Sequence, residues 1–92
     1  MVFKFRLYVA GDAPSSALAM ANLAALCRTY LPEYHDIEVV DVFQQGQRAL
    51  TDGILMTPTL VKLQPRPTCT IVGTLSDTQP LLLAMGLGTV AA

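Results

Sequence analysis

Apolar and polar positions in the first half of the chain follow two different periods. Residues 2–10 alternate at first and then become continuously apolar, which predicts a strand with Lys4 and Arg6 on one face. Residues 15–31 repeat apolar side chains every three or four positions and stop before a proline, which predicts a helix. Residues 37–43 form a short apolar run that predicts a second strand. A helix between two strands favours parallel pairing through a right-handed crossover.

The predicted helix has an almost continuous apolar surface. Its apolar positions form one stripe and a second stripe beside it, so few polar positions remain. We expect this helix to pack on the sheet, with part of its outer face covered by something else. The stripes consist of Ala17, Met20, Ala24, Cys27 and Leu31, and of Leu23, Leu26 and Tyr30.

The second half of the chain predicts four shorter elements. Gly53 ends a polar stretch, and Ser76 with Gln79 three residues later matches a capping box. A Gln-Pro-Arg-Pro turn separates two runs that we expect to form a β-hairpin. The predicted elements are a short helix at 44–53, a strand within 54–63, a strand at 68–73 and a short helix completed by 81–85.

Pro58 bears most directly on the fold class. It lies near the start of the apolar run 54–63, where a proline cannot donate a hydrogen bond to a sheet. The predicted order βαβαββα is that of the thioredoxin-like α/β fold with a mixed sheet. In that fold a proline, usually cis, begins the strand after the second helix. We expect Pro58 to be this cis proline; a trans proline at the start of an edge strand is the alternative.

The predicted fold also says where redox chemistry would lie. A thioredoxin-like redox enzyme needs a thiolate at the N-terminus of the first helix, where the helix dipole lowers the thiol pKa. The residues at that place read Gly-Asp-Ala-Pro-Ser-Ser and include no cysteine. Cys27 lies several turns further along and Cys69 lies in a late strand, and we expect both to be small buried hydrophobic residues. Thiol–disulfide exchange is therefore excluded.

Other catalytic and metal chemistry lacks partners in the sequence. His35 is the only histidine, and we expect it to be solvated in a loop. Asp41 is the one charge inside an apolar strand, where we expect a strand-end carboxylate paired with a lysine or a backbone N–H; a buried functional acid is the alternative. No phosphate-binding loop, nucleophile elbow or metal cluster occurs. We expect no catalytic residue, no metal and no cofactor.

Composition adds an expectation about partners. The 92 residues predict a single domain over 1–92, with 52% hydrophobic and only 14% charged residues, where about 25% charged is typical. So small a domain cannot bury all of these apolar side chains, and we expect some to face a second copy or another protein. The net charge of −1 gives no case for nucleic acid or an anionic membrane. Without a signal-peptide core or a membrane-spanning stretch, the expected location is the cytoplasm.

Several sequence blocks together resemble the KaiB family of circadian-clock proteins. They keep the family's order through about residue 86 and need no gap. The blocks are KFRLYVAGDAPSS, IEVVDVF, DGILMTPTLVKL, PRP and IVGTLSD. The resemblance implies a thioredoxin-like fold, and it implies a metamorphic family whose resting form, often a tetramer, has the alternative arrangement βαββααβ.

The resemblance also implies an adaptor without catalysis. Family members bind the N-terminal ring of the RecA-like ATPase KaiC, recruit KaiA and displace the kinase SasA. We therefore expect a KaiC-like ATPase as partner, with KaiA and a SasA-type kinase as further partners, in the circadian clock or a related timing or stress pathway. The expected binding residues are Gln44, Arg48, Lys62 and Arg66, whereas Gly11 is expected to shape the fold.

The sequence departs from the family pattern at several positions. Ala84 stands where the family typically has glycine, and alanine favours a helix by about 1 kcal/mol. We therefore expect the thioredoxin-like arrangement, with a helix at 77–86, to be favoured more than in a clock KaiB, although Gly86 opposes it. Basic family residues are replaced by Gln44, Gly53, Cys69 and Thr70, which should loosen docking on an acidic ring.

Two other functions stay open at this point. A divergent thioredoxin-like domain with residual redox or peroxidase activity would need an activated group near residues 12–16 and Pro58. A homo-oligomeric domain with a different protein partner would use its surplus apolar surface as a subunit interface.

Overall fold

The first half of the chain forms the predicted strand–helix–strand unit. The computed structural model describes residues 2–86, beginning with β1 (Phe3–Val9), α1 (Pro14–Tyr30) and β2 (His35–Asp41). The strands β1 and β2 pair in parallel, from Phe3 opposite His35 to Val9 opposite Asp41. The predicted parallel crossover is therefore confirmed.

The second half adds two antiparallel strands and two short helices. These elements are α2 (Gly46–Thr51), β3 (Thr59–Gln64), β4 (Cys69–Val72) and α3 (Gln79–Ala84). The sheet has the order β2-β1-β3-β4, and β3 pairs antiparallel with both β1 and β4. This mixed sheet confirms the βαβαββα prediction. The C-terminal segment is a helix, so the alternative βαββααβ arrangement is not the one adopted here.

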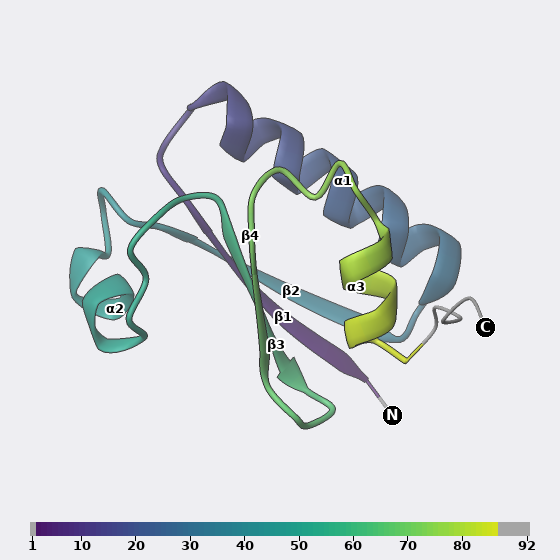
Figure 1. Cartoon of the computed structure of the whole chain (residues 1–92). Coiled ribbons are helices and arrows are strands. Elements are labelled where there is room, and N and C mark those ends of the chain that lie inside the picture. The colour runs from purple at the N-terminus through teal and green to yellow at the C-terminus, as the bar shows by residue number, and fades with distance from the viewer. Residues whose placement is uncertain (1, 87–92) are drawn as a thin grey trace.

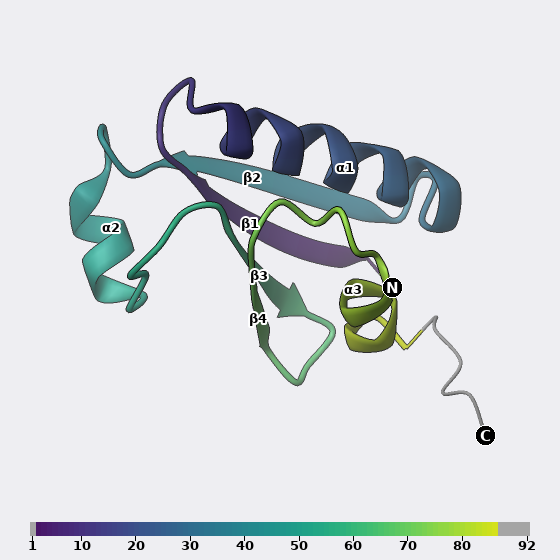
Figure 2. The same cartoon turned by 45° about the horizontal axis from the view of Figure 1, so that its top comes forward.

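The two faces of the sheet are covered unequally (Figures 1 and 2). Helices α1 and α3 lie over one face, and α2 lies at one end of the molecule, away from them. The larger core cluster lies between the sheet, α1 and α3, and it includes Phe5, Leu7, Leu23, Leu60 and Leu81. A smaller cluster joins the sheet to α2 and consists of Tyr8, Val40, Ala49 and Val61.

The bounds of β2 correct one prediction. The strand begins two residues earlier than expected, because the backbone of His35 pairs with Phe3. His35 is therefore the first residue of a strand rather than a solvated loop residue. Its side chain is partly buried, and its Nδ1 lies 2.7 Å from the carbonyl oxygen of Leu31 at the end of α1.

The buried face of α1 differs from the predicted stripes. The helix buries Ser16, Ala19, Leu23, Leu26 and Cys27. Ser16 is accommodated there because its Oγ accepts a hydrogen bond from the backbone N–H of Ala10 at 3.0 Å. The predicted stripe members Ala17, Met20 and Tyr30 are exposed instead.

The last helix begins without the predicted capping box. Its N-cap is Thr78, and no side chain caps it there. Asp77 instead accepts the backbone N–H of Gln79 at 3.1 Å, while the hydroxyls of Thr74 and Ser76 lie 2.8 Å apart. The capping-box prediction is therefore wrong, because Ser76 is engaged outside the helix.

Gly86 also acts differently from the expectation. It follows the last turn of α3 with φ +73°, and its N–H bonds to the carbonyl oxygen of Leu83 at 3.1 Å. Glycine is the favoured residue for this left-handed conformation after a helix. Gly86 therefore ends α3 and does not oppose it.

The peptide bond before Pro58 is cis, as predicted. The bonds before Pro65 and Pro67, in the β3–β4 turn, are also cis. Within residues 2–86, no helix has the length and apolar character needed to cross a membrane.

Candidate interaction surface

The end of the sheet where α1 begins carries structural contacts rather than a thiol. Asp41 Oδ1 accepts the backbone N–H groups of Gly11 at 3.2 Å and Phe43 at 2.9 Å. Gly11 has φ +52°, and a Cβ there would come within 3.3 Å of the Phe43 ring. A side chain at position 11 would therefore be strained twice, by its backbone conformation and by its neighbour. Asp41 and Gly11 together fix how β1 and β2 leave the sheet.

The two cysteines differ in environment. Cys27 is buried in α1, and burial raises the pKa of its thiol to about 11. It therefore stays protonated near neutral pH and is a poor nucleophile. Cys69 lies in β4 and is only partly buried, so the prediction of a buried cysteine is confirmed for Cys27 alone. In the described part of the chain, no three His, Cys, Asp or Glu side chains gather as metal ligands.

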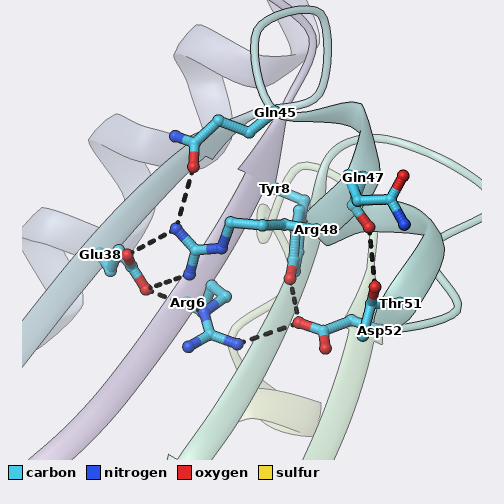
Figure 3. A network of polar contacts seen from close by, with 8 residues as sticks. All are labelled: Arg6, Tyr8, Glu38, Gln45, Gln47, Arg48, Thr51 and Asp52. Carbon is cyan, nitrogen blue, oxygen red and sulfur yellow. Dashed lines mark hydrogen bonds and ion pairs between the residues drawn. The ribbon is translucent and has the colours of Figure 1, made fainter.

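A polar network connects α2 to the sheet (Figure 3). The guanidinium of Arg48 binds Glu38 with both terminal nitrogens, each 2.9 Å from a carboxylate oxygen. Arg6 on β1 binds the same carboxylate through its Nε at 2.9 Å. The network therefore joins β1, β2 and α2 through one acidic side chain.

A second carboxylate extends this network to the end of α2. Asp52 accepts a hydrogen bond from Arg6 at 2.9 Å and another from the hydroxyl of Tyr8. Burial raises the pKa of Tyr8, and the bond to Asp52 raises it further. The hydrogen bond from Tyr8, aided by Arg6, lowers the pKa of Asp52. Arg48 and Arg6 lower the pKa of Glu38 to about 2. Both carboxylates are therefore ionised near neutral pH.

The four predicted binding residues do not form one surface. Gln44 is exposed in the loop before α2, and Arg48 lies near it but is committed to Glu38. Lys62 is only 4% exposed, and its Nζ donates to the carbonyl oxygen of Ala84, on the face that α3 covers. Arg66 is exposed in the β3–β4 turn, at the opposite end of the sheet from α2. Only Gln44 and Arg48 lie close together.

The sequence interpretation missed an exposed apolar surface beside α2. The segment 54–58 precedes β3 and is not part of a strand. Ile54 packs against the smaller core cluster and Pro58 is buried, whereas Leu55 and Met56 are exposed. We call Phe43, Leu55, Met56 and Val72 the apolar end surface. Their exposed fractions are 79%, 95%, 60% and 54%. Gly53 and Pro58 on either side of the segment were the signal that it forms a loop.

Two cavities adjoin this surface. One measures about 260 Å³ and is lined by Phe43, Leu55 and Met56, together with Ala49 of α2 and the residues that directly follow β1 and β2, Ala10 and Val42. The other measures about 230 Å³ and is lined by Leu55, Met56 and Val72. Leu55 and Met56 border both cavities, so apolar side chains from another molecule would meet an uneven apolar surface here.

Comparison with known proteins places this chain among clock-protein relatives. The KaiB domain model matches residues 6–87. The circadian clock protein KaiB3 of Synechocystis is 38% identical over 82 residues, which cover 89% of this chain and 80% of that protein. The circadian clock oscillator protein KaiB of Picosynechococcus is 39% identical over 85 residues, covering 92% of this chain and 82% of the relative.

Solved structures show the same fold at lower identity. The N-terminal domain of Synechococcus elongatus SasA superposes with a TM-score of 0.78 at 19% identity, covering 100% of this chain and 90% of that domain. The thioredoxin Deadhead of Drosophila superposes with a TM-score of 0.73 at 19% identity, covering 92% of this chain and 79% of that protein. These likenesses show a thioredoxin-like fold, and the family match and the sequence relatives show more: this chain belongs to the KaiB family.

Proposed function

We propose that this protein is a non-catalytic clock adaptor that binds the ring of a KaiC-type RecA-like ATPase. The observation that carries the proposal is the family match over residues 6–87 in a thioredoxin-like chain that has no thiol where that fold needs one. The N-terminus of α1 begins with Ala13 and Pro14, and Cys27 is held protonated in the core. A thioredoxin-like scaffold without this chemistry is suited to binding.

The contacts around α2 favour this element as the docking region. Gln44 is exposed before α2, and Arg48 is held in a fixed orientation by two bonds to Glu38. A positioned guanidinium loses little side-chain freedom when a partner contacts its free edge. Arg66, in the β3–β4 turn, is a separate contact. Lys62 contributes to binding only indirectly, by supporting α3, because its ammonium group is bound to the carbonyl oxygen of Ala84.

The small number of unpaired cations near α2, in the described part of the chain, determines how strongly we expect the partner to bind. The described part of the chain carries few basic side chains near α2, and Arg48 is already paired with Glu38. Steering toward an acidic ring is therefore weak, and association should depend only slightly on ionic strength. KaiA and a SasA-type kinase are proposed as further partners through the same family relationship.

A pull-down against a phosphomimetic KaiC hexamer with ATP tests the proposal. We expect a complex that forms at micromolar protein and weakens at least about tenfold in the Gln44→Ala, Arg48→Ala double variant. Arg28→Ala is the matched control, because Arg28 is an exposed cation on α1. Absence of binding at tens of micromolar, with the chain folded by circular dichroism, would reject this function while leaving the family membership intact.

A further inference from the structure

We propose that β4 accepts an extended peptide segment of another protein, which adds to the sheet as a fifth strand. In the described part of the chain the strand order is β2-β1-β3-β4, so β4 pairs with β3 on one side only. In both views α3 lies to one side of β4 and α2 lies away from it on the other (Figures 1 and 2). An open edge of this kind can bind an extended segment through main-chain hydrogen bonds.

The backbone groups available at this edge belong to Thr70 and Val72. The N–H of Gly73 donates to the carbonyl oxygen of Pro58 at 2.9 Å, so Gly73 bonds toward the chain that enters β3. Successive residues of an antiparallel strand direct their N–H and C=O groups alternately toward one neighbouring strand and away from it. Residues 69 and 71 therefore bond toward β3, and residues 70 and 72 point outward. A fifth strand finds two donors and two acceptors there.

The sequence of β4 does not oppose such pairing. Natural edge strands are commonly protected from incoming strands by charged side chains or by proline. The other edge strand, β2, carries Asp36, Glu38 and Asp41, whereas β4 reads Cys-Thr-Ile-Val and has neither a charge nor a proline. Three of its four residues are β-branched and favour extended structure. Of the two edges, β4 is therefore the less protected.

Two cavities lie on opposite faces of β4, which favours an extended peptide over a helix. Ile71 packs against the larger core cluster, and on its side a cavity of about 350 Å³ is lined by Ile71, Leu75 and Asp77 among others. Thr70 and Val72 are exposed on the other face and line the cavity of about 230 Å³. Successive side chains of an extended chain point to opposite faces. One peptide residue can therefore enter the first cavity while its neighbour enters the second.

The residues around these cavities determine the kind of peptide. Asp52 and Asp77 are the charged side chains among those that line the two cavities. Asp52 is already bound to Arg6, whereas Asp77 is exposed at the larger cavity. We therefore expect a peptide with large apolar side chains at two successive positions and a lysine or arginine beside Asp77.

A second copy of this chain suits the edge less well. Two copies paired antiparallel about Ile71 would bring Cys69 to the larger cavity and Thr70 and Val72 to the smaller one. None of these side chains is as long as leucine, and none is basic. The larger cavity would therefore stay largely unfilled by such a pairing.

An NMR titration with a synthetic peptide tests the proposal. The probe is the heptapeptide Lys-Thr-Leu-Leu-Thr-Val-Thr, blocked at both ends, which places its lysine near Asp77 and its leucines at the two cavities when it runs antiparallel to β4. We expect a dissociation constant on the order of 100 μM, because the short edge offers few hydrogen bonds. Hydrogen exchange at the amides of Thr70 and Val72 should slow when the probe binds.

The variant Thr70→Pro removes one outward N–H group. Proline is tolerated at an edge position whose N–H faces solvent, so the pairing of β4 with β3 should persist. We expect the dissociation constant for the probe to rise at least about fivefold. Thr70→Val is the matched control: it keeps the N–H and the shape of the side chain, and the constant should change less than about twofold. Asp77→Asn should weaken binding and reduce its dependence on salt, while its oxygen can still accept the N–H of Gln79.

Each result decides the proposal. No binding at about 1 mM probe would overturn it. Equal binding by Thr70→Pro and Thr70→Val, both folded by circular dichroism, would also overturn it by placing the peptide elsewhere. A concentration-dependent dimer of the unaltered chain that Thr70→Pro abolishes would give the edge to a second copy and would overturn it as well. The titration contains no ATPase ring, so its outcome is independent of the proposed adaptor function.

Discussion

The ammonium group of Lys62 donates to the carbonyl oxygen of Ala84 across 2.7 Å. Lys62 comes from β3, and Ala84 is the last residue of α3, so the bond connects the sheet to the C-terminus of a short helix. The last carbonyl groups of a helix lack partners within it and carry partial negative charge. A buried cation at this point therefore satisfies one carbonyl group and is itself stabilised by the partial negative charge there. A residue expected to bind a partner directly thus supports α3.

Replacing Lys62 by methionine should loosen α3. Methionine keeps the apolar stem but removes the donor, and a lost hydrogen bond to a charged group costs about 1.5–3 kcal/mol. We expect the free energy of unfolding in urea to fall by about 1.5–3 kcal/mol. Amide exchange at residues 81–85 should accelerate more than exchange in α1.

Lys4→Met is the control for this variant. Lys4 is an exposed lysine on β1, so its replacement should change the free energy of unfolding by less than about 0.5 kcal/mol. Equal effects of the two substitutions, or unchanged exchange in α3, would show that the contact with Ala84 contributes nothing to the stability of α3.

Glu38 makes stability depend on pH at the acid end. Arg48 and Arg6 lower its folded-state pKa from 4.5 to about 2. A group with a depressed folded-state pKa contributes stability that is present above its unfolded-state pKa and is lost as pH falls toward the folded-state value. Its contribution should therefore be complete above about pH 5 and disappear between about pH 4.5 and 2. The lowered pKa of Asp52 acts in the same direction.

Urea denaturation from pH 7 to pH 2 measures this contribution. Glu38→Gln should be less stable than the unaltered chain at pH 7, and the two should converge as the pH approaches 2. Because Glu38 is exposed, added salt should narrow the difference at pH 7. Two denaturation curves that differ by the same amount at every pH would mean that the ionised network contributes no stability.

The order of helices and strands could be predicted from the sequence, but which individual side chains are buried could not. Periodicity and the position of Pro58 were sufficient for the fold, because both reflect short-range rules of the backbone. Ser16 and Lys62 are buried because their polar atoms find partners on other elements, Ala10 and Ala84. Such partners lie far apart in sequence or outside the helix, so no local pattern reports them.

The exposed apolar surface at Leu55 and Met56 could not be predicted from hydrophobicity for a related reason. Leu55 and Met56 belong to an apolar run that is typical of a buried strand. In the structure the strand begins only at Thr59, so the first part of the run is a loop that leaves both side chains outside. Hydrophobicity alone does not distinguish a core strand from an exposed apolar loop. The flanking Gly53 and Pro58 did carry that information.

Ala84 should set how firmly the chain keeps its thioredoxin-like arrangement. It ends a helix of six residues, a length at which propensity matters because isolated short helices are marginal. Glycine in its place costs up to about 1 kcal/mol and weakens the helix. We therefore predict that Ala84→Gly shifts population toward the alternative arrangement that the family resemblance implies. Amide NMR spectra should show a second set of peaks that includes residues 77–86.

The control for this shift is Ala25→Gly. Ala25 is an exposed position of α1, which belongs to the half of the chain that the resemblance implies is shared by both arrangements. Its replacement should lower the free energy of unfolding by a similar amount without producing a second set of peaks. Under the proposed adaptor function, binding to the ATPase ring should weaken in Ala84→Gly by the fraction of competent molecules that is lost, and it should be unchanged in Ala25→Gly. Ala84→Gly could instead give one set of peaks and lose only stability. That result would mean that destabilising α3 unfolds the chain instead of converting it to the other arrangement. The helix propensity of Ala84 would then not control the choice between the two arrangements.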